Sequence, residues 1–570
     1  MSLFLNLQKC KTEEDVKNNL ERRDSLIPLD DRRFKGAYYT PLKVVEKAYE
    51  VLNRVLGSGW QKEYVVWDPC CGVGNLETKH SNVRNVYMST LDEADIDVMR
   101  ATKTSVAAER FQYDYLNDDI TEDGKIDYSL TNKMPASLQK AIAESRVGKK
   151  KILILMNPPY AEAGNGSNKG GKEKVAKTKV ARYCMAGYGK ATNELFTQFM
   201  ARIGKEIPNA VLAMFSKLKY INGPNFEAFK NMWNGEYLGG FIIHSKVFGS
   251  IKGNFPIGFL IWQTNNKEGT KKTPINEVFC EVLDKNVRAI GEKTFYNIPT
   301  SQYLNVWIKR PKRNDEDAIP LCNAITVSKV KKPLTKWAHN AIAYMYCGKN
   351  DFQHAGGQTA LFSSTYGDGH GFYVMSENLW QAGVVFTVRR IIPHTWINNN
   401  DQFLWPSKPL PQEFINDCLI WMLFSGNNLT ASADGLEWRG KTWSIVNHFI
   451  PYNEEELGSP ARFESDFLVR YMKDKDYSEE AKTVLEAGKA IWKAYFATSF
   501  PHPIREKYKL NRVDVGWYQI RMAFNMLKKM GEYVSPISFA SLDESYASLT
   551  EKLAPKLYEL GFLKGARQLV

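Results

Sequence analysis

The chain has 570 residues, of which 44% are hydrophobic and 24% charged, and its formal net charge is +13. This composition is that of a globular protein and excludes a mostly disordered, collagen-like or coiled-coil chain. The longest apolar runs are far shorter than the roughly 18 residues that cross a bilayer, and residues 1–11 lack a secretory pattern, so we expect a cytoplasmic location.

The first half of the chain alternates short apolar runs with helical segments. Residues 1–35 are polar and predict an N-terminal extension with a helix around Glu13–Arg23. Thr40-Pro41 predicts a helix start at Leu42–Leu56, since proline fits the first turn. The remaining predicted elements are strands at Tyr64–Trp67, Val86–Leu91, Phe111–Tyr113, Lys151–Met156, Ala210–Phe215, Gly240–His244 and Gly258–Trp262, with helices at Glu93–Thr104 and Glu194–Ile203. This alternation indicates an α/β fold with an open, mostly parallel twisted sheet.

After Gln263 the pattern changes. The segments Lys267–Pro274 and Lys309–Asp317 are densely charged, so we expect a first domain at 36–265, a connecting segment at 266–317 and a mixed α+β, largely helical region at 318–570. Helices are predicted in that last region at Gln412–Phe424, Glu479–Phe496 and Trp517–Met530, and a final one that starts with a capping box at Ser541 and is interrupted by Pro555.

The positive charge is concentrated in one segment. Residues 151–265 contain 15 basic and 6 acidic side chains, whereas residues 1–150 contain 23 and 24. A concentrated positive field suits a polyanionic partner, although a solvated surface is the alternative. The eight cysteines include no CxxC pair and the eight histidines are scattered, so we expect no metal site.

The tetrapeptide Asn157-Pro158-Pro159-Tyr160 directly follows the apolar run 151–156. At the carboxyl end of a parallel strand the chain opens into the ligand crevice. Asn157 offers a side-chain acceptor, and the prolines remove backbone donors and fix φ, which leaves a main-chain carbonyl as a second acceptor. With a stacking ring at Tyr160, this pattern indicates recognition of an exocyclic amine on a flat ring. A plain Pro-Pro turn is the alternative.

A second motif runs from Asp68 through Pro69, two cysteines and Gly72-Val73-Gly74, after the strand at 64–67. A strand, an acidic residue and a tight GxG turn that enters a helix let the backbone approach a cofactor closely. It is not the dinucleotide pattern GxGxxG, because Leu76-Glu77 follows, and no Gly-Lys-Ser/Thr phosphate loop is present. Asn157 follows Gly72 by 85 residues. The GxG turn alone is a weak signal, but the two motifs together are a strong one.

With these motifs the chain resembles the amino-methylating, S-adenosylmethionine-dependent DNA methyltransferases of the N6-adenine group. Their order is similar to the γ class, with a Tyr-Thr-Pro element at Tyr39-Thr40-Pro41, then the Gly loop, then the catalytic tetrapeptide. The resemblance covers about residues 36–263, or 228 of 570. It implies a Rossmann-like methyltransferase domain followed by a target-recognition region. Cys70, Cys71 and Val73 depart from the family's loop and make it less polar.

The resemblance implies S-adenosyl-L-methionine as cofactor and assigns residues to it by matching position. The methionine end would be covered by Tyr39, Thr40 and Pro41, and the amino-acid portion surrounded by Asp68, Gly72 and Gly74. The ribose hydroxyls would bind Asp92, with Asp95 as a rival, and Asp114 and Phe196 would lie beside the adenine. A helix-start carboxylate is the alternative for Asp92 and Asp95, and core packing is the alternative for Phe196.

Two further segments predict DNA contacts. Residues 161–190 hold six glycines, seven basic residues and two acidic ones, so a mobile cationic loop would close over a flipped nucleotide, with phosphate contacts from Lys169, Lys172, Lys174, Lys177 and Lys179. Trp380–Asn400 combines Arg389 and Arg390 with aromatic and amide side chains, which suits phosphate contact and base reading. The alternatives are a solvated insertion for the first and a buried aromatic strand for the second.

The sequence therefore predicts an enzyme that transfers a methyl group from S-adenosylmethionine to N6 of adenine in a specific double-stranded DNA sequence. Base flipping and direct in-line transfer would need no metal. We expect it to be associated with the nucleoid. The sequence leaves open whether it acts beside a separate restriction nuclease or without one. The alternatives are a methyltransferase of RNA or of protein glutamine, and an inactive methyltransferase-fold subunit that only binds DNA.

Overall fold

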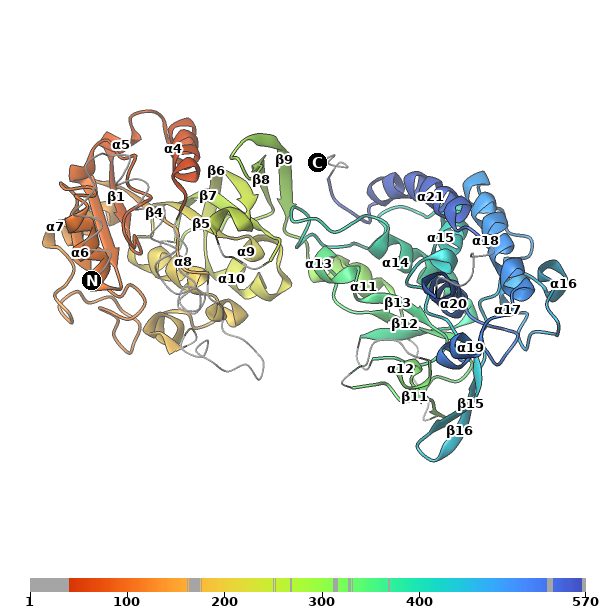
Figure 1. Cartoon of the computed structure of the whole chain (residues 1–570). Coiled ribbons are helices and arrows are strands. Elements are labelled where there is room, and N and C mark those ends of the chain that lie inside the picture. The colour runs from red at the N-terminus through yellow and green to blue at the C-terminus, as the bar shows by residue number, and fades with distance from the viewer. Residues whose placement is uncertain are drawn as a thin grey trace. The chain divides into compact units, whose positions relative to one another are not determined.

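The computed structural model describes residues 40–160, 162, 175, 177–249, 251, 253–266, 269–310, 316–325, 330, 332–367, 370–530 and 537–565. The expected N-terminal helix at Glu13–Arg23 lies outside these residues, as do Tyr39, Lys169, Lys172 and Lys174. The chain divides into two compact units (Figure 1). Unit 1 holds the described residues up to Ile298 and Thr395–Asn400, and unit 2 holds Pro299–His394 and the described residues from Asp401 on.

Unit 1 is built on a nine-stranded sheet with the order β3-β2-β1-β4-β5-β7-β6-β8-β9 (Figure 1). The strands are β1 (Tyr64–Asp68), β2 (Val86–Thr90), β3 (Glu109–Gln112), β4 (Lys151–Met156), β5 (Val211–Lys217), β6 (Gly235–His244), β7 (Pro256–Thr264), β8 (Glu277–Leu283) and β9 (Ala289–Tyr296). Strands β1 to β5 are parallel. Strand β7 runs antiparallel to both β5 and β6. The expected α/β fold with a mostly parallel sheet is confirmed.

Helices cover both faces of the sheet, and β4 shows why its sequence is apolar throughout. Leu153 and Leu155 join the core beneath α4 (Leu42–Leu56) and α6 (Glu93–Ala101). Ile152, Ile154 and Met156 join the opposite core beneath α7 (Ala136–Arg146) and α8 (Leu195–Glu206). A strand buried on both faces has no polar alternation. The short helices of unit 1 are α5 (Trp60–Glu63), α9 (Lys219–Asn222) and α10 (Glu227–Met232).

The expected connecting segment 266–317 differs most from the structure. Strands β8 and β9 lie within it and extend the sheet, so unit 1 continues to Ile298. Most residues of β9 are exposed or half-buried, because it is the edge strand, and it therefore lacks the apolar pattern that marks a strand in sequence. The helix expected after Gly74 also does not form: turns lead from Pro69 to a 3-10 helix at Val83–Asn85.

Unit 2 is mixed α+β and largely helical, as expected. Its strands are β10 (Glu316–Asp317), β11 (Lys336–Trp337), β12 (Ala343–Cys347), β13 (Thr359–Phe362), β14 (Gly371–Val374), β15 (Ala433–Trp438) and β16 (Lys441–Ile445). Its helices are α11 (Leu304–Trp307), α12 (Leu321–Ala324), α13 (Phe352–Ala355), α14 (Leu379–Arg390), α15 (Gln412–Phe424), α16 (Glu454–Leu457), α17 (Phe467–Met472), α18 (Glu479–Ala497), α19 (His502–Tyr508), α20 (Trp517–Lys529) and α21 (Ala540–Glu559).

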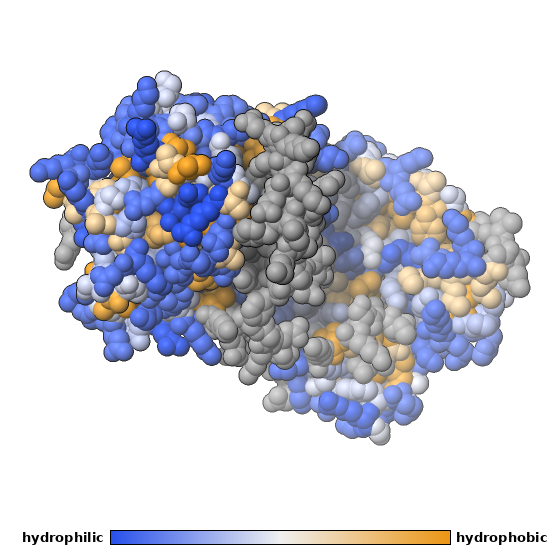
Figure 2. All heavy atoms as spheres, turned by 60° about the vertical axis from the view of Figure 1, so that its left-hand side comes forward, coloured by the Kyte–Doolittle hydropathy of each residue, from blue (hydrophilic) through white to orange (hydrophobic). Residues whose placement is uncertain are grey.

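Three of the unit 2 helices, α15, α18 and α20, match the sequence prediction to within one residue at each end. Helix α21 begins at Ala540, so Ser541 lies inside it and is not its cap, and Pro555 is accommodated within the helix. None of the helices in the part of the chain that the structure describes is long and apolar enough to cross a membrane. On the face shown in Figure 2, hydrophilic residues predominate and hydrophobic ones lie in small groups.

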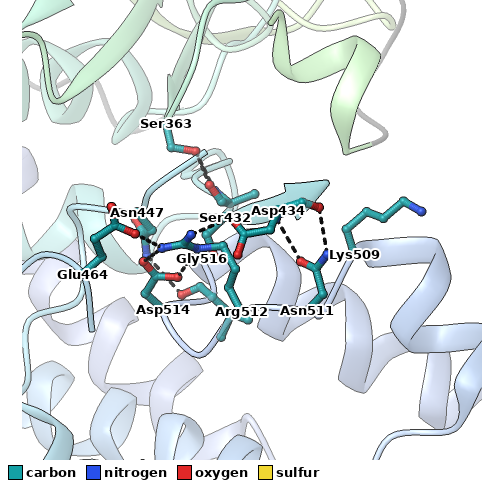
Figure 3. Close-up of polar contacts among 12 residues, drawn as sticks. Ser363, Ser432, Asp434, Asn447, Glu464, Lys509, Asn511, Arg512, Asp514 and Gly516 are labelled. Atoms are coloured by element: carbon teal, nitrogen blue, oxygen red, sulfur yellow. Dashed lines mark hydrogen bonds and ion pairs between the residues drawn. The ribbon is translucent and has the colours of Figure 1, made fainter. Parts of the chain in front are cut away.

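An ion-pair network centred on Arg512 fixes the β15–β16 hairpin within unit 2 (Figure 3). The guanidinium of Arg512 contacts Asp434 at 2.7 Å, Asp514 at 2.8 Å and Glu464 at 2.5 Å. Asn511 adds a pair of hydrogen bonds between its side-chain amide and the main chain of Asp434. With its side chain only 11% exposed, Arg512 holds three chain segments in one arrangement.

Candidate active site

Five polar residues of unit 1 lie at the carboxyl ends of β1 to β5. Because these strands are parallel, the five positions lie at the same end of the sheet, where open α/β sheets form their ligand crevice. We call this region the crevice edge. In strand order these residues are Asp114 after β3, Asp92 after β2, Asp68 at the end of β1, Asn157 after β4 and Lys217 at the end of β5. Neighbouring strands lie about 5 Å apart. The chain reverses direction of winding between β1 and β4, which is where open α/β sheets bind ligands.

The loop after β1 needs its glycines for their backbone conformation. Gly72 and Gly74 have φ angles of 56° and 79°, in the left-handed region that favours glycine. Gly74 also lies against the side chain of Met88, so the loop packs directly on β2. The amide of Cys71 donates to the carbonyl of Ser89 at 2.9 Å and ties the loop to the same strand. The loop is thereby held in a fixed, tight course at the crevice.

Asp68 and Glu77 form a buried carboxyl pair beneath this loop. Their exposed fractions are 2% and 1%, and the two carboxyl groups interact with each other. Burial raises the pKa of both carboxyl groups, and the charge of Asp68 raises the pKa of Glu77 further. Two adjacent buried carboxyls cannot both ionise, so they share a proton. The sequence interpretation did not include Glu77, because a single acidic residue after Leu76 carries no signal of its own.

The substitution Glu77→Gln is expected to stabilise the protein more at pH 8 than at pH 5. The raised pKa means that the folded chain keeps a proton that the unfolded chain releases as the pH rises above about 4.3, the ordinary value for glutamate, so the parent loses stability through that window. Glutamine can donate to Asp68 without titrating. Thermal unfolding at both pH values measures the difference, with the exposed Glu122→Gln as control. An equal effect of Glu77→Gln at both pH values would contradict the shared proton.

The side-chain amide of Asn157 connects the tetrapeptide at 157–160 to Thr40 of the Tyr-Thr-Pro element. Its Nδ2 donates to Oγ1 of Thr40 at 3.0 Å, and its Oδ1 accepts from the hydroxyl of Tyr160 at 2.5 Å. Thr40 is only 3% exposed and lies just before α4. The amide is thus held with its nitrogen toward Thr40 and its oxygen toward Tyr160. An amine that displaced the Tyr160 hydroxyl would meet a pre-oriented acceptor.

Tyr160 is more enclosed than the sequence interpretation assumed. It is 7% exposed, and its ring lies edge-on to Phe248 at a centroid distance of 6.5 Å. Burial raises the pKa of its hydroxyl well above the usual value, so the group remains a donor at neutral pH. Burial likewise raises the pKa of Cys70 and Cys71, which keeps both thiols protonated and argues against a nucleophilic role.

The carboxylates after β2 and β3 differ in what they contact. Asp95 accepts a hydrogen bond from Oγ1 of Thr90 at 2.9 Å and so supports the end of β2. Asp92 is exposed at the start of α6. Asp114 closes its own turn, because its carboxylate accepts from the amide of Leu116 at 3.1 Å and from Nδ2 of Asn117 at 2.8 Å. Of the two rivals, Asp92 is therefore the one presented at the surface of the crevice edge.

A buried ion pair on α8 holds the turn that carries Asp114. Arg202 and Glu206 are both fully buried and lie 3.2 Å apart. The guanidinium of Arg202 donates to the carbonyls of Tyr115 and Asp118, and Glu206 accepts from the hydroxyl of Tyr115 at 2.8 Å. In sequence these residues are an ordinary i, i+4 pair on a helix. Only their burial shows that they connect α8 to the segment after β3.

Neither a protein-family model nor a curated protein sequence matches the chain. Among solved structures, a putative class I S-adenosylmethionine-dependent methyltransferase from Listeria monocytogenes is 12% identical with a TM-score of 0.30, covering 49% of this chain and 74% of its own. The type IIL restriction-modification enzyme MmeI in complex with DNA is 11% identical with a TM-score of 0.36, covering 95% and 82%. The DrdV–DNA complex is 12% identical with a TM-score of 0.35, and the match covers 61% of this chain and 39% of that one.

These identities and TM-scores are too low to support a function, so the strand order and the loops at the crevice edge decide the fold. Unit 1 has a Rossmann-like α/β fold. Among its described residues, unit 1 contains no group of three histidine, cysteine, aspartate or glutamate side chains able to hold a metal ion.

Two residues assigned from sequence are interior side chains. Phe196 of unit 1 is 0% exposed and stacks on Phe226 at 6.3 Å, so core packing, the alternative weighed for it, is what the structure shows. Arg389 in unit 2 is 1% exposed and donates to Oγ1 of Thr359 and to the carbonyls of Gly348 and Lys349. Its guanidinium is used inside unit 2 and is not presented to DNA, because α14 is a buried helix rather than an exposed segment.

The other predicted DNA contacts that the structure describes are one half-buried and two exposed side chains. Arg390 is half-buried, and its guanidinium donates to the carbonyls of Gly356 and Thr359. Lys179 is exposed, and its Nζ donates to the carbonyl of Ile120 at 3.4 Å. Lys177 is exposed as well. Of the described candidates, Lys177 and Lys179 thus remain in a position to meet a phosphate.

Proposed function

We propose that the chain transfers a methyl group from S-adenosylmethionine to N6 of adenine in double-stranded DNA. The observation that carries this proposal is the Asn157 amide, oriented by Thr40 and Tyr160 at the carboxyl end of β4. It lies one strand away from the glycine loop after β1, on the opposite side of the switch point. A cofactor on one side and an amine on the other would face each other there.

The residues at the crevice edge fit the cofactor. S-adenosylmethionine supplies an electrophilic methyl group and carries a positively charged sulfonium and ammonium. The Asp68–Glu77 pair offers buried negative charge close to the loop, which suits a cationic ligand. Asp68, Gly72 and Gly74 would surround the amino-acid portion, with Thr40 and Pro41 over the methionine end. Asp92 would bind the ribose, and the turn at Asp114 would lie beside the adenine.

The reaction needs orientation more than acid–base chemistry. With Oδ1 of Asn157 and the Pro158 carbonyl accepting the two hydrogens of the target amine, the nitrogen lone pair would point toward the methyl group. The stiff segment Asn157–Tyr160 keeps these acceptors in place before the substrate arrives. Positioning of this kind lowers the barrier for an in-line displacement. Duplex DNA would have to release its target adenine from the stack, and the exposed Lys177 and Lys179 would contact its phosphates. Methylation would protect the DNA from cleavage by a separate restriction nuclease, which is the proposed partner.

Nucleoside analysis of DNA from cells that express the chain tests this proposal. We expect N6-methyladenine in this DNA, and none above background in cells that carry an empty vector. Methylcytosine in the DNA, or methyl groups found only in RNA or on protein glutamine, would replace the proposed substrate. Absence of any methylated product, together with duplex binding, would indicate the inactive DNA-binding subunit.

A further inference from the structure

Four charged side chains form a cluster just beyond the catalytic tetrapeptide. Nζ of Lys219 lies 2.8 Å from both Glu162 and Glu194, and Nζ of Lys217 lies 3.3 Å from Glu194 and 3.7 Å from Glu162. Each lysine thus contacts both carboxylates. The sequence interpretation placed none of these four residues in a site.

The cluster lies at the crevice edge. Lys217 ends β5, the strand beside β4, and Lys219 begins the short helix that follows it. Glu162 comes two residues after Tyr160, and its main chain pairs with that of Glu194, which precedes α8. The two lysines therefore lie next to the segment assigned to the target base, on the side of the crevice away from the cofactor loop.

The two carboxylates are not equivalent. Glu194 is 3% exposed and is a fixed internal counter-charge, whereas the side chain of Glu162 is 45% exposed. Lys217 and Lys219 are 16% and 34% exposed, so each can be reached from solvent. Glu194 alone balances one of the two lysines, and Glu162 balances the other through part-buried contacts at the more exposed side of the cluster. Because the Glu162 carboxylate is itself partly solvated, another anion can replace it at the lysines.

We propose that Lys217 and Lys219 bind a backbone phosphate of the DNA beside the target nucleotide, and that Glu162 occupies this phosphate site until DNA arrives. The proposal rests on the proposed function, because it takes duplex DNA as the ligand. A backbone phosphodiester is a monoanion with two charged acceptor oxygens, as a carboxylate is, but the neighbouring phosphates of the duplex add to its field and counterions are released on binding. The duplex therefore displaces Glu162 while Glu194 keeps the lysines in place. Glu162 thereby inhibits binding of DNA to the free enzyme.

Binding of the full chain to a short fluorescein-labelled DNA duplex, titrated over a range of salt concentrations, tests the site. Glu162→Gln should bind the duplex more tightly than the parent, by roughly twofold to fivefold, as expected for removal of one exposed ion-pair partner. Lys219→Gln should bind more weakly, and the slope of log affinity against log salt should fall by about 1, as for loss of one phosphate contact. Lys219→Arg should keep the slope of the parent.

A second lysine–glutamate pair, at the amino ends of the strands, provides the control. Lys151 and Glu63 also lie 2.8 Å apart, but at the amino end of β4. Glu63→Gln and Lys151→Gln should leave both the affinity and the salt slope at the parent values. Equal affinities for Glu162→Gln and the parent, or an unchanged slope for Lys219→Gln, would overturn the phosphate site while the parent's own duplex binding left the proposed function intact. No binding of the parent to duplex DNA at low salt would overturn both.

Discussion

The substitution Asn157→Ala is expected to lower the rate of methyl transfer by about 10²–10³-fold or more, while cofactor affinity stays near that of the parent. Asn157 is placed to hold the target amine, not the cofactor, and an acceptor that is used mainly in the transition state affects turnover rather than ground-state binding. Single-turnover transfer of labelled methyl groups to DNA measures the chemical step. Calorimetry with S-adenosylhomocysteine measures cofactor binding.

Tyr160→Phe is the matched control for Asn157→Ala. It removes the hydroxyl that donates to Oδ1 of Asn157 and keeps the ring, so most of the transfer rate should survive. Transfer by Asn157→Ala at a rate near that of the parent would remove Asn157 from the chemical step. A loss of cofactor binding in the same variant would show that its defect is structural, since Nδ2 also donates to Thr40 just before α4.

The second large effect is expected for Arg202→Met, which should lower the free energy of unfolding by about 3–5 kcal/mol. The substitution leaves Glu206 fully buried without its countercharge. It also removes the donors to the buried carbonyl of Tyr115 and to the part-buried carbonyl of Asp118. Urea unfolding followed by tryptophan fluorescence measures the change. A loss below about 1 kcal/mol would contradict the role given to this pair.

Two variants separate the buried pair from ordinary surface pairing. Arg100 contacts Asp97 at 3.2 Å on α6 with both side chains more than half exposed, and Arg100→Met should change stability by at most about 0.5 kcal/mol. The double variant Arg202→Met, Glu206→Gln should regain part of the loss, because no charge is then left alone in the interior. The turn that carries Asp114 depends on the same contacts, so Arg202→Met should also weaken cofactor binding.

The sequence by itself determined the elements that position the site. The run Lys151–Met156 was predicted as a buried strand, since it is short, apolar and followed by Asn157 and two prolines, and the structure has a strand there. The motif Asp68–Gly74 has glycine at the two positions where the backbone takes positive φ angles. Glycine adopts such angles without strain, so the residue type alone indicated a tight turn. In both cases the deciding physics is local, so a short stretch of residues was enough to place a strand and a loop at the crevice.

Only the tertiary structure decided which polar side chains face the crevice and which support it. Arg389 was predicted to contact DNA, but its guanidinium donates hydrogen bonds to main-chain carbonyls inside unit 2. Glu77 and Glu206 carried no signal in sequence, yet both are fully enclosed. The meeting of Thr40 with Asn157, 117 residues later in the chain, follows from how α4 and β4 pack. Burial and pairing of charges depend on neighbours that are distant in sequence. A charged side chain that these neighbours desolvate must be paired inside the protein and becomes structural, whereas the same residue type left exposed is available to a ligand.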